Sequence, residues 1–183
     1  GFILIICMDY LLDPVTNLIP IPAWFEELME KELLGEDMFT FIGTVIAAPV
    51  LEEILMRGII LDGFLKRYTP QKAIVWSAIL FGVMHLNPWQ AITAFTIGLL
   101  LGLLYWKTKS IWLCILLHVA NNGTIYLLAS FSGLEDYDTL SEYLGMTRYI
   151  LGYFIALVVL AVCVYYFYKQ LWQGGSQKKA LQL

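Results

Sequence analysis

The chain has 183 residues, of which 60% are hydrophobic and only 14% are charged. A soluble domain carries about 25% charged residues, because it must cover its apolar core with polar surface. This composition, with a mean hydropathy of +0.72, therefore indicates an integral membrane protein and excludes an intrinsically disordered one. The formal net charge of −4 excludes a nucleic-acid-binding protein, which needs a basic surface to neutralise phosphates.

Apolar segments long enough to cross a bilayer follow one another along the chain. A helix needs about 20 residues to cross a hydrocarbon layer about 30 Å thick. We expect spans at residues 38–66, 70–86, 88–107, 110–131 and 148–171, and a shortened one at 1–12. The predicted fold is all-α, a polytopic transmembrane helix bundle of about six spans. It forms a single domain over residues 1–172, with a catalytic core at 38–131 and a polar C-terminal tail at 173–183.

Two dipeptides predict where helices begin. Thr69-Pro70 combines an N-cap residue with a proline in the first helical position, and Asn87-Pro88 marks a tight reversal before the next helix. Residues 23–34 have the pattern of a short helix lying at the membrane surface, with apolar and acidic residues on different sides.

Basic residues predict the orientation in the membrane. They lie in alternate connections and after the last span, whereas the intervening connections, around residues 13–37 and 135–142, are acidic. Cytoplasmic loops are enriched in lysine and arginine, so both chain ends are expected in the cytoplasm. The basic residues that set this orientation are Lys66, Arg67, Lys72, Lys107, Lys109, Lys169, Lys178 and Lys179.

Ionisable and amide side chains gather inside three of the apolar helices. A charged side chain deep in a membrane costs about 2.5–3.5 kcal/mol, so such residues are rare and usually functional. Counting the rise along each helix places four of these side chains, those of Glu52, His85, His118 and Asn122, at a similar depth. The full set of ionisable and amide side chains comprises Glu52, Glu53 and Arg57 in one helix, His85 in the next, and His118, Asn121 and Asn122 in a third.

The spacing of these residues predicts which of them pair. Glu53 and Arg57 are four residues apart with the acid first, which favours an ion pair and leaves Glu52 free. Phe81 and His85 share one helix face, as do His118 and Asn122. A buried hydrogen-bond network that only holds helices in register is the alternative interpretation. A free carboxylate beside two imidazoles favours a catalytic role over a purely structural network.

This set of side chains is suited to amide hydrolysis. Glu52 can act as a general base that takes a proton from water and returns it to the leaving group. His85 can orient that water, while His118 and Asn122 can donate hydrogen bonds to the oxyanion of a tetrahedral intermediate. Ser77 and Cys114 lie on the same helices as the histidines, so a covalent nucleophile is a less favoured alternative.

The motifs E-E-x-x-x-R at Glu52, Glu53 and Arg57, F-x-x-x-H at Phe81 and His85, and H-x-x-x-N at His118 and Asn122 resemble those of one family. It is the CAAX protease and bacteriocin-processing family, and the likeness covers about residues 44–126. The resemblance implies an intramembrane glutamate endopeptidase without a cofactor, with Glu53, Arg57 and Phe81 supporting the site. It further implies a membrane-associated peptide or lipidated protein as substrate, contact with membrane lipid, and a location in a bacterial cytoplasmic (inner) membrane.

Three other functions use the same residues. Glu52, His85 and His118 could be the ligands of a catalytic zinc ion with an open fourth position, which would make the protein a membrane metalloprotease. A non-catalytic peptide-binding or bacteriocin-immunity protein could use the same cavity for binding. A transporter with a proton-relay carboxylate is the third alternative, although the sequence shows no inverted repeat that would favour it.

Overall fold

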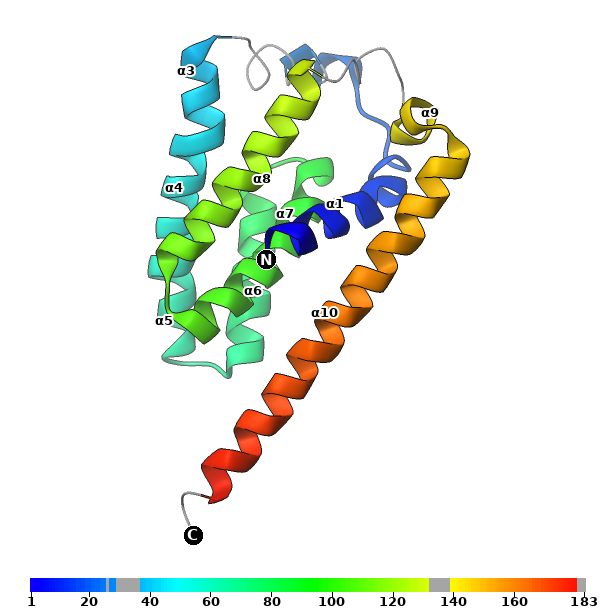
Figure 1. Cartoon of the computed structure of the whole chain (residues 1–183). Coiled ribbons are helices and arrows are strands. Elements are labelled where there is room, and N and C mark those ends of the chain that lie inside the picture. The colour runs from blue at the N-terminus through cyan, green and yellow to red at the C-terminus, as the bar shows by residue number, and fades with distance from the viewer. Residues whose placement is uncertain (26, 29–36, 132–138, 181–183) are drawn as a thin grey trace.

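The computed structural model describes residues 1–25, 27–28, 37–131 and 139–180, and every regular element in these residues is a helix. The predicted all-α fold is therefore confirmed (Figure 1). One long helix is built from five consecutive pieces: α3 (Met38–Phe41), η1 (Ile42–Ala47), α4 (Ala48–Glu53), η2 (Ile54–Leu61) and α5 (Asp62–Leu65), of which η1 and η2 are π-helical. The others are α1 (Phe2–Thr16), α6 (Pro70–Met84), α7 (Pro88–Thr108), α8 (Ile111–Phe131), α9 (Leu140–Leu144) and α10 (Met146–Ala180).

Four helical segments are long and apolar enough to cross a membrane, which identifies an integral membrane protein. They are Met38–Leu65, Pro88–Thr108, Ile111–Ser130 and Met146–Tyr166, and they match four of the predicted spans. The span expected at 70–86 is different, because α6 has only 15 residues and a length of about 22 Å, short of a full crossing. Six full spans are therefore not confirmed.

The two predicted helix starts are confirmed. Thr69 is the N-cap of α6 and Asn87 the N-cap of α7, where the Asn87 side chain accepts a hydrogen bond of 2.9 Å from the Gln90 backbone N–H. Between the two helices, Leu86 adopts a positive φ of 57°, which reverses the chain sharply. Helix α10 continues to Ala180, into the stretch expected to be a polar tail.

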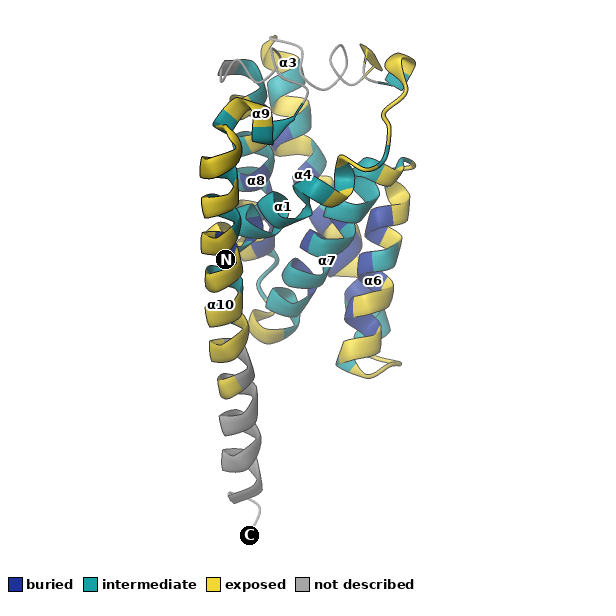
Figure 2. Cartoon of the chain, turned by 90° about the vertical axis from the view of Figure 1, so that its right-hand side faces the viewer, coloured by how far each residue is buried: buried dark blue, intermediate teal, exposed yellow. Residues whose placement is uncertain are grey.

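Among the helices that the structure describes, α6 and α7 share the most extensive contact, and small residues allow it. A Cβ atom added at Gly98 would lie 3.2 Å from the Cα and Cβ of Ala78, and one added at Gly102 would lie 3.2 Å from Cγ2 of Ile74. The G-x-x-x-G spacing in α7 thus lets the two backbones approach, as in other membrane helix pairs. Buried residues are shared among the long helix, α6, α7 and α8, whereas α10 is mostly exposed along its described part (Figure 2).

Helix α10 is attached to the bundle through α1. The Tyr149 hydroxyl donates to Oδ2 of Asp13 at 2.7 Å, and the Tyr10 hydroxyl donates to the Tyr149 carbonyl at 3.1 Å. These polar contacts lie at the interface of the two helices, and the apolar face of α10 beyond them is free to contact lipid.

Candidate active site

A buried ion pair forms the base of the site. Arg57 Nη1 donates to Oε1 of Glu53 at 2.7 Å, and both side chains are almost completely buried. Arg57 Nη2 also donates to the Gly98 carbonyl at 3.2 Å, and the guanidinium lies 4.8 Å from the centre of the Phe81 ring. The predicted Glu53–Arg57 pair is therefore confirmed, and it ties η2 to α7.

Glu53 also contacts a histidine on another helix. Nδ1 of His118 lies 3.0 Å from Oε1 of Glu53. Because a carboxylate paired with arginine only accepts hydrogen bonds, Nδ1 must carry the proton. Nε2 of His118 is then directed at the other carboxylate, 3.8 Å from Oε2 of Glu52.

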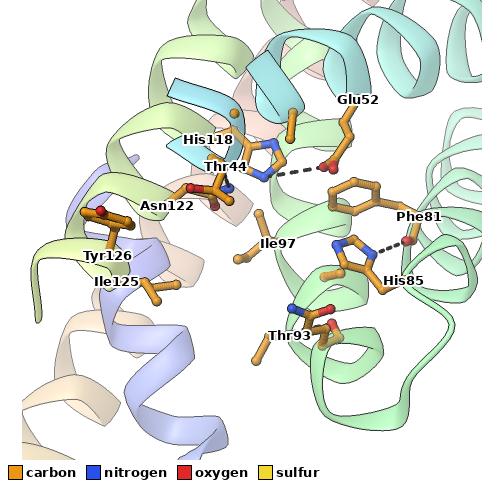
Figure 3. Close-up of a pocket in the computed structure, with 14 residues that line it drawn as sticks. Thr44, Glu52, Phe81, His85, Thr93, Ile97, His118, Asn122, Ile125 and Tyr126 are labelled. Atoms are coloured by element: carbon orange, nitrogen blue, oxygen red, sulfur yellow. Dashed lines mark hydrogen bonds and ion pairs between the residues drawn. The ribbon is translucent and has the colours of Figure 1, made fainter. Parts of the chain in front are cut away.

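Glu52 is the less buried of the two acids, since its side chain is 24% exposed while that of Glu53 is 0% exposed. Its carboxylate lies beside His118 and faces a cavity, where it can meet water (Figure 3). Sequence reasoning expected Arg57 to neutralise Glu53 and leave Glu52 free, and the geometry has this arrangement.

Phe81 organises the two histidines. Its ring packs edge to face against His85 at 5.1 Å and against His118 at 5.7 Å, measured between ring centres. His85 lies at the C-cap of α6, where its Nδ1 is 2.9 Å from the Phe81 carbonyl. A carbonyl only accepts, so Nδ1–H donates, and Nε2, which accepts hydrogen bonds when the ring is neutral, faces the cavity (Figure 3).

Asn122 is held by the backbone carbonyl of Thr44, which the π-helical bonding of η1 leaves free to accept a hydrogen bond from another helix. In η1 the Ala48 N–H donates to the Gly43 carbonyl, five residues back. The next bond of this series would need an N–H at Pro49, which proline lacks. The freed Thr44 carbonyl instead accepts from Nδ2 of Asn122 at 3.0 Å. Since an amide nitrogen carries two protons, the second one remains for a ligand.

These side chains meet in one cavity of about 510 Å³ between α4, α6, α7 and α8. All four predicted catalytic residues line it, as does Phe81, whereas Glu53 and Arg57 lie behind it. Sequence reasoning missed four further polar or aromatic wall residues, which are Thr44, Gln90, Thr93 and Tyr126. Gln90 and Thr93 could have been found, because they are polar residues close after Asn87-Pro88 in an apolar helix.

The two side chains considered as covalent nucleophiles do not line this cavity. The Ser77 hydroxyl donates to the Met56 carbonyl at 3.4 Å, and the Cys114 thiol lies 3.5 Å from the carbonyls of Leu101 and Ser110. Both are structural contacts between or within helices.

Glu52, His85 and His118 are the cavity side chains that could bind a metal ion. Among the described residues, no three or more His, Cys, Asp or Glu side chains are grouped as a metal site. One nitrogen of each histidine is directed at a protein acceptor, namely Glu53 for His118 and the Phe81 carbonyl for His85. The zinc alternative therefore stays a prediction that a chelator can test.

Comparison with known proteins supports the resemblance. A family model described as Type II CAAX prenyl endopeptidase Rce1-like matches residues 34–124, which include all three motifs. Residues 34–124 belong to the Rce1-like family. The predicted family is thus confirmed over the segment that builds the cavity, from α3 to most of α8.

A curated protein similar to this chain is named "Putative membrane peptidase YdiL" and comes from Bacillus subtilis (strain 168). It is 29% identical over 83 residues, which are 45% of this chain and 34% of the relative. The chain thus spans about a third of that protein's length. No solved structure matches the chain at a significant level.

Proposed function

We propose that this chain is an intramembrane endopeptidase that hydrolyses a peptide bond in a membrane-associated peptide or lipidated protein. The observation that carries the proposal is the convergence of Glu52, His85, His118 and Asn122 on one cavity. Membership of the Rce1-like family and the relative named as a membrane peptidase support the same reaction class. The relative is bacterial, which supports a location in a bacterial cytoplasmic membrane.

The reaction begins with a water molecule between Glu52 and His85. Glu52 takes one proton as the water oxygen bonds to the carbonyl carbon of the substrate, and Nε2 of His85 accepts a hydrogen bond that orients the water. The products of this step are a tetrahedral intermediate with a negatively charged oxygen and a protonated Glu52. When the carbon–nitrogen bond breaks, Glu52 returns its proton to the departing amine.

Two further side chains that line the cavity, Asn122 and His118, stabilise the negative oxygen. The free proton of the Asn122 amide is one donor. His118 donates from Nε2 only when this nitrogen also carries a proton, because Nδ1–H is directed at Glu53. In that state His118 is an imidazolium between two carboxylates, which can donate to the oxyanion and keep its other hydrogen bond.

The proposal is tested with purified protein and a library of lipidated and unlipidated membrane peptides, with cleavage read by mass spectrometry. Glu52→Gln keeps the size of the side chain but removes the base, and we expect cleavage to fall by about 10²–10⁴-fold. Asp62→Asn is the matched control, because it makes the same change on the same long helix outside the cavity. Wild-type cleavage should persist in a chelator.

Three results would contradict this function. If Glu52→Gln cleaves as fast as wild type, the carboxylate is not the base. If a chelator abolishes cleavage and zinc restores it, the metalloprotease alternative is correct. A Glu52→Gln protein that still produces the cellular effect of the wild type would instead support the non-catalytic binding function.

A further inference from the structure

The last turn of α6 is tighter than the rest of the helix. The His85 N–H donates to the Gly82 carbonyl, three residues back, at 3.2 Å. The Leu86 N–H donates to the Val83 carbonyl in the same way, at 3.1 Å. An α-helical bond would instead run four residues back, from His85 to Phe81. The Phe81 carbonyl accepts from the ring of His85 at 2.9 Å (Figure 3). The tight turn therefore frees the acceptor that holds the proton on Nδ1.

An uncommon backbone conformation follows this turn. Leu86 has a φ of 57°, in the left-handed region that residues other than glycine rarely adopt. Such a conformation persists only where the surrounding structure holds it. The Leu86 side chain is 90% exposed, so its own packing contributes little. Contacts made by the residues on either side of Leu86 must hold the turn.

The side chain of Asn87 makes such contacts. Its Nδ2 donates to the His85 carbonyl at 2.8 Å and to Oε1 of Gln90 at 2.7 Å, while its Oδ1 accepts from the Gln90 N–H at 2.9 Å. An amide nitrogen carries two protons, so both protons and the oxygen are engaged. Asn87 thus joins the end of α6 to the start of α7 across Leu86, and it does not line the cavity.

The start of α7, to which Asn87 is tied, is itself held from outside. Trp89 packs on Phe25 at 4.8 Å between ring centres and donates its indole N–H to the Ile19 carbonyl at 2.9 Å. Of the 23–34 segment expected at the membrane surface, Trp24 and Phe25 are described and lie here, while residues 26 and 29–34 lie outside the described residues. Asn87 therefore connects His85 to an anchored helix start.

We propose that Asn87 is a positioning residue for catalysis, because it keeps the last turn of α6 tight and so keeps Nε2 of His85 an acceptor for water. Without its two donors, the His85 carbonyl loses this partner and Leu86 can relax toward ordinary helical bonding. The His85 N–H then competes for the Phe81 carbonyl, and the ring proton can move to Nε2. A protonated Nε2 donates to water and cannot orient it for Glu52. The catalytic part of this role rests on the proposed function, whereas the position of the ring proton does not.

The test is Asn87→Ser, which separates positioning from helix capping. Serine is as good an N-cap as asparagine, but its side chain is shorter and offers one proton in place of two. Asn17→Ser is the matched control, since Asn17 is an exposed asparagine that donates to Asp13 at 3.2 Å and lies outside the cavity. Asn87→Asp also keeps the cap and removes both donors, and it replaces Asn87→Ser if that variant does not fold.

Two measurements are made on each variant. Peptide cleavage gives kcat and KM, and nitrogen NMR of protein isotopically labelled at histidine shows which ring nitrogen carries the proton when the ring is neutral. The chain has two histidines, so the His85 signals are those lost in His85→Gln. We expect Asn87→Ser to lower kcat by about 10²-fold, the loss that a displacement of about 1 Å can cause, with KM unchanged. Its His85 ring should show both tautomers, whereas the wild type and Asn17→Ser show Nδ1–H alone.

The proposal requires both changes in an active protein, so either one without the other overturns it. A lower unfolding temperature with kcat and the His85 tautomer unchanged also overturns it, because Asn87 would then be only a cap. If Glu52→Gln abolishes cleavage but Asn87→Ser changes neither reading, the proposed function stands and this inference fails. If the wild type cleaves no peptide, the proposed function fails, and the tautomer alone decides whether Asn87 positions His85.

Discussion

His118 donates its Nδ1–H to Oε1 of Glu53 across 3.0 Å, and Arg57 donates to the same oxygen at 2.7 Å. One buried carboxylate oxygen thus connects three helical elements: α4, η2 and α8. Glu53 also sets which nitrogen of His118 faces Glu52, although it does not itself line the cavity. It acts as a positioning residue.

The first prediction concerns this shared oxygen. Glu53→Gln removes the charge that compensates Arg57, and breaking a buried ion pair by changing one partner costs about 3–5 kcal/mol. We expect a markedly lower unfolding temperature in detergent. Asp62→Asn, which breaks the exposed contact with Lys66, should change it little. Equal unfolding temperatures for both variants would show that the Glu53–Arg57 pair does not stabilise the fold.

The second prediction concerns Asn122. Asn122→Ala removes one donor to the oxyanion, and loss of one such donor lowers kcat by about 10²–10³-fold. KM should change little, because the contact strengthens only in the transition state. Asn121→Ala is the matched control, since Asn121 is the neighbouring residue and does not line the cavity. If KM rises instead while kcat stays constant, Asn122 binds the ground state of the substrate.

The third prediction concerns His85. In the structure Nδ1–H donates to the Phe81 carbonyl, so Nε2 is the acceptor for water. His85→Gln places an amide oxygen near the Nε2 position, whereas His85→Ala leaves neither nitrogen. We expect kcat to fall in both, by about 10²–10⁴-fold in the alanine variant if proton handling is lost entirely, and less in the glutamine variant. Equal losses would argue against water orientation by Nε2.

The fourth prediction concerns the contact between α6 and α7. A Cβ atom added at Gly82 would lie 2.8 Å from the Ala91 carbonyl oxygen, a backbone atom that cannot move alone. Gly82→Ala should therefore destabilise the protein by about 1–3 kcal/mol and lower activity, since Gly82 is one turn from His85. Gly63→Ala meets no atom within 4 Å and should stabilise the helix by about 0.5–1 kcal/mol. Unfolding temperatures that shift in the same direction would refute the packing argument.

The sequence predicted the site well where the relevant contacts lie within one helix. The Glu53–Arg57 pair follows from a spacing of four residues, and the starts at Pro70 and Pro88 follow from the chemistry of proline. The spans at 38–66, 88–107, 110–131 and 148–171 follow from apolar length. The family follows from three spaced motifs, which the Rce1-like match confirms.

Contacts between helices could not be predicted, because they depend on how each helix is rotated and displaced. The His118–Glu53 hydrogen bond joins residues 65 positions apart. The role of the Thr44 carbonyl depends on the π-helical bonding of η1. Because bonds there run five residues back, the missing N–H of Pro49 leaves the Thr44 carbonyl free to accept from Asn122. The reversal before α7 was predicted at Asn87-Pro88, but α6 ends two residues before the end of the predicted 70–86 span and is too short for the full crossing expected there.

Two π-helical segments flank α4 and make the direction of its two acids, Glu52 and Glu53, sensitive to where a residue is gained or lost. A wider turn accommodates one more residue than an α-helical turn does, so η1 and η2 set the angular position of α4 relative to the helix ends. Deleting the one extra residue of η1 and restoring ordinary turns would leave the acids close to their present direction, whereas deleting a residue from an ordinary turn such as α3 would rotate them by about 100° relative to the start of the helix. Both carboxylates would then point toward acyl chains, and a change that leaves length and hydrophobicity nearly untouched would silence the protein.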